Sequence, residues 1–354
     1  MSEIQPPAAA GPVREAHRFD EAALARWMSE NVEDFEGPLT VRQFKGGQSN
    51  PTFWLGSPSG RYVMRKKPPG KLLPSAHAIE REYRIMHALA DTDVPVARVH
   101  GLCEDSSLIG TPFFVMDHVE GRIFWNVQLP DMPPEERTAI YAEMLRVLAA
   151  LHSVDFEAVG LGDYGKVGGY VARQVRRWTK QYEASVTDDI PAMNALGAWL
   201  AEHVPDAEGD ETTLTHGDFR LDNLIFHPTE PRVLAVIDWE LSTLGHPISD
   251  LAYGAMLYHI VMPGVGGLEG VDYAATGIPD EDTYVARYCT HTERDEIAHW
   301  AYYKAFSLFR LASILQGVYA RSLQGNASSE NAGMYGAAVH VLAGIACRIA
   351  GVSV

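Results

Sequence analysis

Residues 214–250 read LTHGDFRLDNLIFHPTEPRVLAVIDWELSTLGHPISD, and this stretch carries the clearest indications of fold and chemistry in the chain of 354 residues. Two short apolar runs, 224–226 and 233–237, flank a turn rich in proline and therefore predict a β-hairpin. Asn223 precedes the first strand and Asp238 follows the second. The two side chains are thus expected at the same open end of the hairpin.

Asn223 and Asp238 would supply an amide oxygen and a carboxylate, which are the hard oxygen ligands that Mg²⁺ prefers. Asp218 lies five residues before Asn223, in the loop that leads to this end of the hairpin. From there its carboxylate could orient a hydroxyl group and accept its proton during phosphoryl transfer. Each of the three residues could instead be a turn or cap residue. All three in this order around a hairpin favour a metal-dependent phosphotransferase.

The same residues resemble the catalytic loop of the kinase-like superfamily. His216, Gly217 and Asp218, followed by Asn223, match its HxDxxxxN pattern, and the sequence IDWE at 237–240 takes the place of the DFG motif. The form HGD…N…IDW is similar to the aminoglycoside phosphotransferase and choline kinase-like family. The segment HPISDLA at 246–252 also resembles the GxPxxDLA segment of that family.

This resemblance implies a role for each matching residue. Asp218 would be catalytic, Asn223 and Asp238 would hold Mg²⁺, and the nucleotide would be ATP, with GTP as an alternative. His216 would brace the catalytic loop, and Asp250 would hold this loop in place as a structural residue.

The resemblance also implies an α+β fold with two lobes, and the order of strand-like and helical segments along the sequence agrees with it. Helical spacing over 19–30 and 75–90 and short strand-like runs at 39–44, 52–55, 61–65 and 113–119 fill the first part of the chain. After Gly121 helical spacing dominates, and one of the expected helices covers 248–262. We expect a small N-lobe with an antiparallel sheet and one main helix, and a larger, mostly helical C-lobe. The expected boundaries are a disordered tail at 1–17, the N-lobe at 18–117, a hinge at 118–125 and the C-lobe at 126–354.

Three N-lobe features resemble a nucleotide site. The turn at 46–50 has glycines that would let backbone N–H groups approach phosphates. The sequence YVMRKK at 62–67 offers Arg65 or Lys66 for the α- and β-phosphates, and strand alternation favours Arg65. Glu82 falls on the apolar side of the 75–90 helix and therefore needs a partner, which Arg65 could be. The expected nucleotide-binding residues, including the hinge strand, are Gly46, Gly47, Gln48, Ser49, Asn50, Arg65, Glu82, Met116, Asp117, His118 and Val119.

Composition narrows the class of partner. The formal net charge of −17 argues against nucleic acid and anionic membrane surfaces. Cys103, Cys289 and Cys347 are far apart and form no CxxC pair, which favours a reducing compartment and a cytoplasmic location. The apolar stretch at 332–354 contains His340 and Arg348 and is expected to be a buried helix rather than a membrane span. The oligomeric state and the role of the loop at 263–282 stay open.

The acceptor is less constrained. Arg220, two residues after Asp218, could steady the γ-phosphate, bind an anionic acceptor or pair with Asp222. Several segments, HGDFRLDN among them, closely resemble the phosphotransferase domains associated with acyl-CoA dehydrogenases, which implies a hydroxyacyl acceptor. Arg310 could meet an acidic group of that substrate or form an ion pair between helices. An aminoglycoside-type antibiotic kinase and a catalytically inactive binding protein of the same fold are the alternatives.

Overall fold

The computed structural model describes residues 5–45, 50–70, 77–206, 211–323 and 332–354. The chain divides into two compact units. The first unit contains Met1–Arg122 and Leu224–Glu240, and the second contains Ile123–Asn223 and Leu241–Val354. The predicted hairpin at 224–240 therefore clusters with the N-terminal sheet, although the sequence-based boundaries place it in the C-lobe.

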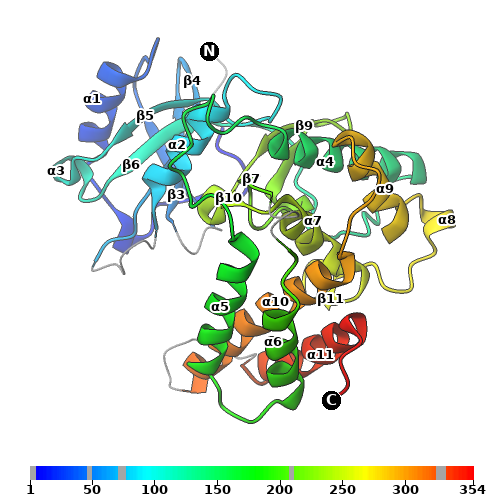
Figure 1. Cartoon of the computed structure of the whole chain (residues 1–354). Coiled ribbons are helices and arrows are strands. Elements are labelled where there is room, and N and C mark those ends of the chain that lie inside the picture. Colours follow the sequence, from blue (N-terminus) through cyan, green and yellow to red (C-terminus); the bar gives the residue numbers. More distant parts are fainter. Residues whose placement is uncertain (1–4, 46–49, 71–76, 207–210, 324–331) are drawn as a thin grey trace. The chain divides into compact units, whose positions relative to one another are not determined.

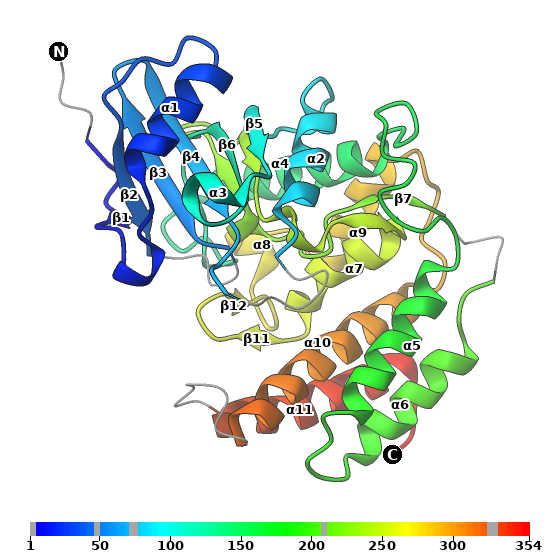
Figure 2. The ribbon, with the colours of Figure 1, turned by 90° about the vertical axis from the view of Figure 1, so that its left-hand side faces the viewer.

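A six-stranded antiparallel sheet forms the first unit, with the strand order β1-β2-β3-β4-β6-β5 (Figures 1 and 2). The strands are β1 (Ala10–Gly11), β2 (Thr40–Phe44), β3 (Thr52–Ser57), β4 (Gly60–Lys66), β5 (Val99–Cys103) and β6 (Phe113–Asp117). The helices of this unit are α1 (Glu21–Asn31), α2 (Ile79–Leu89) and α3 (Ser106–Ile109). The predicted strands β2, β3, β4 and β6 and the predicted helices α1 and α2 are all present.

Strand alternation gives the sheet two apolar faces. Phe53 and Met64 pack with Leu24 and Met28 of α1 on one face. Phe114 contacts Tyr83 of α2 on the other, with ring centroids 6.1 Å apart. Successive side chains of a strand point to opposite faces, so neighbouring residues of β4 serve different surroundings.

Two strands of the first unit were not predicted. β5 has a β-bulge between Val99 and Gly101, which interrupts the alternation that a strand pattern needs. β1 lies in the segment expected to be a disordered tail, where Ala10 and Gly11 pair with Phe44 and Gln43. This pairing uses backbone groups, so no side-chain pattern predicted it.

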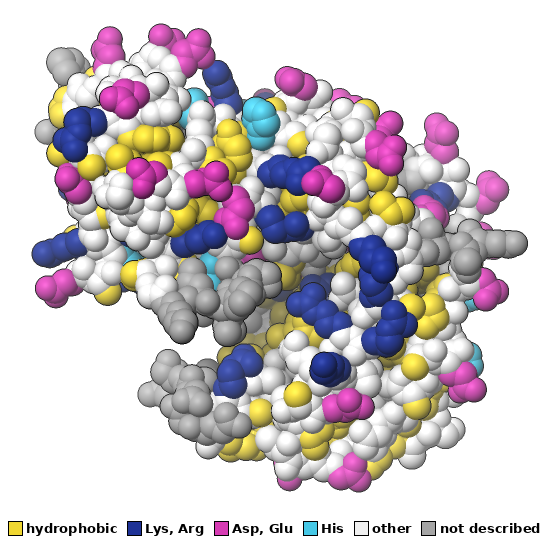
Figure 3. All heavy atoms as spheres, turned by 60° about the vertical axis from the view of Figure 1, so that its left-hand side comes forward, with side chains coloured by type: hydrophobic (Ala, Val, Ile, Leu, Met, Phe, Trp, Pro, Cys, Tyr) yellow, Lys and Arg dark blue, Asp and Glu magenta, His cyan; other side chains and the backbone are white. Residues whose placement is uncertain are grey.

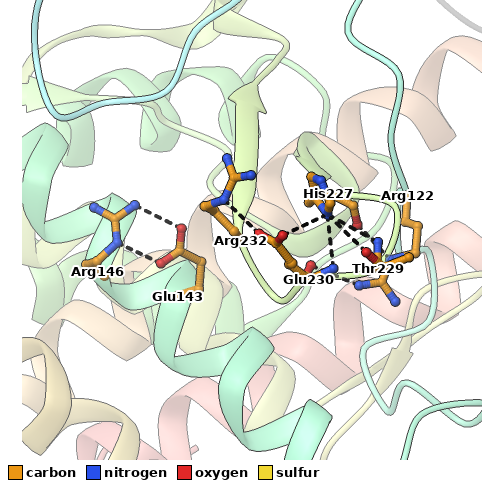
Figure 4. A network of polar contacts seen from close by, with 7 residues as sticks. All are labelled: Arg122, Glu143, Arg146, His227, Thr229, Glu230 and Arg232. Atoms are coloured by element: carbon orange, nitrogen blue, oxygen red, sulfur yellow. Dashed lines mark hydrogen bonds and ion pairs between the residues drawn. The ribbon is translucent and has the colours of Figure 1, made fainter.

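The hairpin of β8 (Leu224–Phe226) and β9 (Val233–Val236) is present as predicted, with Leu224 opposite Val236. Arg122 ties it to the rest of the first unit. Its Nε donates to the carbonyl oxygen of His227 at 2.9 Å, and its Nη2 donates to that of Glu230 at 3.0 Å (Figure 4). Its backbone N–H also bonds the carbonyl of Phe226 at 2.8 Å. The hairpin is thus held at its turn as well as along its strands.

Helices make up most of the second unit. Figure 2 shows α5, α6, α10 and α11 gathered together. The helices are α4 (Pro134–His152), α5 (Tyr170–Glu183), α6 (Pro191–Glu202), α7 (Pro247–Ala255), α8 (Tyr273–Thr276), α9 (Glu281–His291), α10 (Trp300–Leu323) and α11 (Ala332–Ala350). The strand pairs are β7 (Thr213–Thr215) with β10 (Thr243–Gly245), and β11 (Val261–Met262) with β12 (Gly266–Gly267).

Two helical predictions need correction. The helix expected over 248–262 ends at Ala255, and the chain continues through a 3-10 turn into β11. The helix expected to be buried, α11, buries one side through residues such as Leu342 and Ala346 but leaves Val341 exposed. Residues Gly333–Ala350 of α11 are long and apolar enough to cross a membrane, with a mean hydropathy of 1.4, and 28% of this window is buried.

Candidate active site

Arg65 and Glu82 form an ion pair in the first unit, as the sequence predicts. Arg65 lies near the end of β4 and Glu82 in the first turn of α2, and Nε of Arg65 is 3.2 Å from Oε2 of Glu82. Asn50 donates from Nδ2 to Oε1 of Glu82 at 2.9 Å. Nη2 of Arg65 also lies 3.7 Å from Oδ1 of Asp238. One guanidinium therefore connects the helix, the sheet and the residue that follows the β8–β9 hairpin.

Burial dominates the electrostatics of Glu82, whose side chain is 2% exposed. Removal from water raises its pKa from 4.5 to about 7, although the positive charge of Arg65 and the hydrogen bond from Asn50 act in the opposite direction. The negative charges of Asp238 and Glu240 raise this pKa further. The first unit thus places two carboxylates, those of Glu82 and Asp238, beside Arg65.

Lys66 faces the opposite side of the sheet. Its Nζ lies 5.0 Å from the ring centroid of Phe19 and 5.8 Å from that of Phe53, and the residue is 3% exposed. Burial lowers the pKa of its ammonium group. Of the two phosphate-contact candidates, Arg65 is therefore the one on the face shared with Glu82 and Asp238.

Asp238 adopts a left-handed backbone conformation, with φ of +65°. This conformation is uncommon outside glycine and is tolerated best by Asn and Asp. Its carboxylate is 48% exposed, so it is open to a ligand in addition to its contact with Arg65. This left-handed residue lies just after β9, the last strand of the hairpin, and the backbone conformation there sets the direction of its carboxylate.

The predicted hinge strand is β6 with the residues that follow it. The backbone N–H groups of Asp117 and His118 donate to the carbonyl oxygens of Arg98 at 2.8 Å and Arg61 at 3.0 Å. These two amides are therefore committed to the sheet. The carboxylate of Asp117 accepts from His100 at 2.7 Å, and the His118 ring lies parallel to that of Phe44 at 6.4 Å. Met116 is nearly buried and Val119 is partly exposed.

Of the predicted phosphate turn, Asn50 is described and buried, whereas Gly46, Gly47, Gln48 and Ser49 lie outside the described residues.

Asp250 supports the catalytic loop of the second unit. Oδ2 accepts the backbone N–H of His216 at 2.7 Å, and Oδ1 accepts that of Gly217 at 2.8 Å. Nε2 of His152 lies 3.3 Å from Oδ2. Burial alone would raise the pKa of Asp250, but the contacts with His152 and His216 outweigh it and leave that pKa lowered. The carboxylate therefore stays ionised and fixes the backbone just before Asp218.

His216 lies inside the loop rather than at its surface. Its side chain is fully buried, and Nδ1 accepts the backbone N–H of Asp218 at 3.3 Å. Its ring meets that of Phe219 edge-on, with centroids 5.9 Å apart. These contacts give His216 a supporting position, with Asp218 as the loop residue whose carboxylate is partly exposed.

Asp218, Arg220 and Asn223 lie together. Nε of Arg220 is 3.1 Å from Oδ1 of Asp218, and Nη2 is 3.1 Å from Oδ2 of Asp222. Nδ2 of Asn223 donates to the carbonyl oxygen of Asp218 at 2.8 Å and reaches Oδ2 at 3.3 Å. Because the amide nitrogen of Asn223 is used in this way, its Oδ1 is the atom left to accept a ligand.

Arg310 of α10 also reaches this loop. It is 9% exposed, and its Nη2 donates to the carbonyl oxygen of Gly217 at 2.9 Å. Its guanidinium carbon lies 4.6 Å from the ring centroid of Tyr253 and 5.6 Å from that of Trp178. Across the described ranges no carboxylate pairs with Arg310, so the ion pair between helices that its sequence position allowed is not formed.

Sequence reasoning missed His152 and Asn50 as parts of these networks. His152 ends α4, and its Nδ1 lies 2.7 Å from the hydroxyl oxygen of Tyr288 while its other ring nitrogen faces Asp250. Nothing in the spacing of α4 marks a histidine that contacts residues about a hundred positions away. Asn50 was expected to approach phosphates through the turn, whereas its side chain binds Glu82.

Comparisons of sequence and of structure identify proteins similar to this chain. The model of the phosphotransferase enzyme family matches residues 40–300. A crystal structure from Ralstonia eutropha, assigned to the aminoglycoside phosphotransferases, is 54% identical to this chain and has a TM-score of 0.88. The alignment covers 94% of this chain and 99% of that one. Choline kinase from Cryptosporidium parvum has the same fold at 11% identity, with a TM-score of 0.64 over 93% and 95% of the two chains. The two-lobed kinase-like α+β fold is thereby confirmed.

A mouse protein, acyl-CoA dehydrogenase family member 10, is 48% identical over 338 residues, which are 95% of this chain and 31% of that protein. The chain spans less than half the length of the curated relatives it matches.

Proposed function

Because this chain belongs to the phosphotransferase enzyme family, we propose that it moves the γ-phosphate of ATP, or of GTP in its place, to a hydroxyl group of an anionic hydroxyacyl compound. Phosphotransfer to a small molecule is the activity of the family. The nucleotide, the metal ion, the acceptor and the cytoplasmic location are our proposals. The observation that carries the proposed phosphotransfer is the braced loop that presents the partly exposed carboxylate of Asp218 beside Asn223.

Asp218 would orient the acceptor hydroxyl and take its proton. The bond between the γ-phosphorus and the β-bridging oxygen breaks as a bond to the acceptor oxygen forms, and the proton passes from Asp218 to solvent. Such transfer needs positioning and charge more than covalent help from the protein. Asp250 supplies the positioning by fixing the backbone before Asp218.

Arg65 would hold the α- and β-phosphates, with Glu82 fixing its orientation. An arginine can donate two parallel hydrogen bonds to phosphate oxygens. The hinge residues from Met116 to Val119 and the turn at 46–50 would hold the rest of the nucleotide. The cation–π setting of Lys66 supports its exclusion from this role.

Asn223 and Asp238 are the proposed magnesium ligands. Oδ1 of Asn223 and the half-exposed carboxylate of Asp238 suit Mg²⁺, which takes few protein ligands and completes its shell with water and phosphate oxygens. The described residues contain no group of three or more Asp, Glu, His or Cys side chains that could hold a metal ion. Binding by one amide oxygen and one carboxylate does not require such a group. When bound, Mg²⁺ would offset the negative charge of the phosphates.

The charge of α5 supports an anionic acceptor over a polycation. This helix carries Arg173, Arg176, Arg177 and Lys180 in a chain with a net charge of −17. Figure 3 shows Lys and Arg side chains gathered in the part of the surface where α5 lies. An aminoglycoside kinase would instead need acidic side chains to bind its cationic substrate.

A groove beside α5 combines basic side chains with an apolar lining that could accept the acyl chain of the acceptor. Its volume is about 450 Å³, and its lining combines Arg176 and Lys180 with the apolar side chains of Met193 and Phe309. Glu183 is the single carboxylate among the described lining residues. An anionic head group with an acyl chain matches this combination.

The acceptor is tested by following ADP release with ATP and Mg²⁺ while candidate acceptors are varied. We expect turnover with hydroxy acids or hydroxyacyl thioesters and none with aminoglycosides or choline. Asp218→Ala should abolish transfer and retain ATP affinity. Replacing both Arg176 and Lys180 by alanine should raise the KM for the acceptor and leave the KM for ATP unchanged.

Arg26→Ala, on the exposed side of α1, is the matched control and should change neither KM. Turnover with an aminoglycoside alone would contradict the proposed acceptor. ATP binding without turnover on any acceptor would favour the catalytically inactive binding protein.

A further inference from the structure

Buried apolar residues shape the loop that carries Asp218. Phe219 and Leu221 are 1% and 2% exposed, so they anchor the loop in the core of the second unit. The charged side chains between and beside them, Asp218, Arg220 and Asp222, are held in contact with one another. The order of the sequence, D-F-R-L-D, thus produces a compact charged cluster at the proposed catalytic residue.

Both carboxylate oxygens of Asp218 are engaged within this cluster. Oδ1 lies 3.1 Å from Nε of Arg220. Oδ2 lies 3.3 Å from Nδ2 of Asn223 and 3.5 Å from Nη2 of Arg220. A guanidinium group has donors only and cannot accept a proton. A hydroxyl group that donates to Asp218 must therefore compete with Arg220 for the space around these two oxygens, although each oxygen can accept more than one hydrogen bond.

Asp222 gives Arg220 a second partner. Oδ2 of Asp222 is 3.1 Å from Nη2 of Arg220, and Asp222 is 9% exposed. Arg220 can therefore leave Asp218 while one carboxylate still balances its charge, which removes much of the cost of uncovering the base. The contact of Arg220 with Asp218 can therefore break while its contact with Asp222 remains.

We propose that Arg220 is a specificity-determining residue that covers part of the Asp218 carboxylate until an acceptor arrives, and so disfavours transfer of the phosphate to water. This inference rests on the proposed function. A bound acceptor can offset the cost of displacing Arg220 with binding energy from the rest of its structure, and an anionic acceptor offers Arg220 a new partner. A water molecule has no such remote contacts.

The disfavoured reaction is hydrolysis of the nucleotide. In it, water oxygen bonds to the γ-phosphorus, the bond to the β-bridging oxygen breaks, and the proton of water passes to Asp218. The products are ADP and inorganic phosphate. With Arg220 in place, its guanidinium contacts both oxygens of Asp218, so less of the carboxylate is open to accept this proton.

Phosphate release from ATP and Mg²⁺, with water as the only acceptor, tests the inference. Arg220→Gln removes the charge and keeps a polar side chain of similar length, so phosphate release should rise about tenfold, which corresponds to ~1.4 kcal/mol. The rise should appear in kcat, with the KM for ATP unchanged. Arg220→Lys keeps the charge without the forked geometry and should give an intermediate rate.

Two further variants separate this role from a general disturbance. Asp218→Asn combined with Arg220→Gln should return phosphate release to the wild-type rate or below, because the base itself is gone. Arg232→Gln, on the exposed turn of the β8–β9 hairpin where Arg232 pairs with Glu230 (Figure 4), should leave the rate unchanged.

A rate for Arg220→Gln that is equal to or below that of the wild type, with ATP still bound, would overturn the inference and leave the proposed function standing. Failure of the wild type to bind ATP would overturn both.

Discussion

Replacing Glu82 by glutamine should make the stability of the nucleotide-free chain less dependent on pH. Glu82 is almost fully buried, and its pKa is raised from 4.5 to about 7, chiefly by removal from water. Between these two values the folded chain keeps a proton on Glu82 that the unfolded chain has released. The free energy of unfolding must therefore fall as pH rises through this window.

The magnitude follows from the width of the window. At ~1.4 kcal/mol per pH unit, the interval from 4.5 to about 7 corresponds to a loss of ~3 kcal/mol, complete once the pH exceeds the folded pKa. Glutamine resembles the protonated carboxyl group and does not titrate. Wild type and Glu82→Gln should thus be equally stable near the lower limit, and the variant should be more stable by ~3 kcal/mol above the upper one.

Urea unfolding followed by circular dichroism, across pH values from about 5 to about 8, would measure this difference. Glu80→Gln is the matched control on the same helix, because Glu80 is 42% exposed and pairs with Lys67 at the surface. Its effect should stay within about 1 kcal/mol. Equal slopes for the wild type and Glu82→Gln, or a wild type that gains stability relative to the variant as pH rises, would refute the reasoning.

Two further substitutions test the supports of the site. Asp250→Asn should cost about 2–4 kcal/mol of stability near neutral pH, measured by urea unfolding, because two backbone N–H groups and His152 lose an ionised acceptor. Since the pKa of Asp250 is lowered, its contribution should be present above the unfolded value of 3.8 and disappear as pH falls below it. Arg65→Met should weaken ATP binding by at least about tenfold, whereas Lys66→Met, on the opposite face of the sheet, should leave the affinity measured by calorimetry unchanged.

Residue order was enough to predict the arrangements that depend on local geometry. The β8–β9 hairpin and the opposite directions of Arg65 and Lys66 follow from turn composition and strand alternation. The family resemblance implied an ion pair between the strand and the helix, and helical spacing selected Glu82 as the partner of Arg65. These periodicities are set by the backbone, so they can be recognised without knowledge of the tertiary fold.

Arrangements that depend on distant parts of the chain could not be predicted in this way. His152 meets Asp250 across 98 positions, and Arg310 meets Gly217 across 93. The bulge in β5 and the end of α7 at Ala255 also reflect local irregularities that no regular period describes. The pair of Arg220 with Asp222 was one of several predicted alternatives, whereas its second contact, with Asp218, was not predicted.

Binding of the nucleotide with its metal ion is the most direct test of phosphoryl transfer at this site. Thermal unfolding of the wild type and of Asp238→Ala should be compared with ATP, with and without Mg²⁺, because a ligand of the folded state raises the melting temperature. We predict a Mg²⁺-dependent rise in the wild type that Asp238→Ala loses. A rise of equal size in both proteins would contradict the proposed role of Asp238. No rise in the wild type, with either ATP or GTP, would contradict the nucleotide site itself.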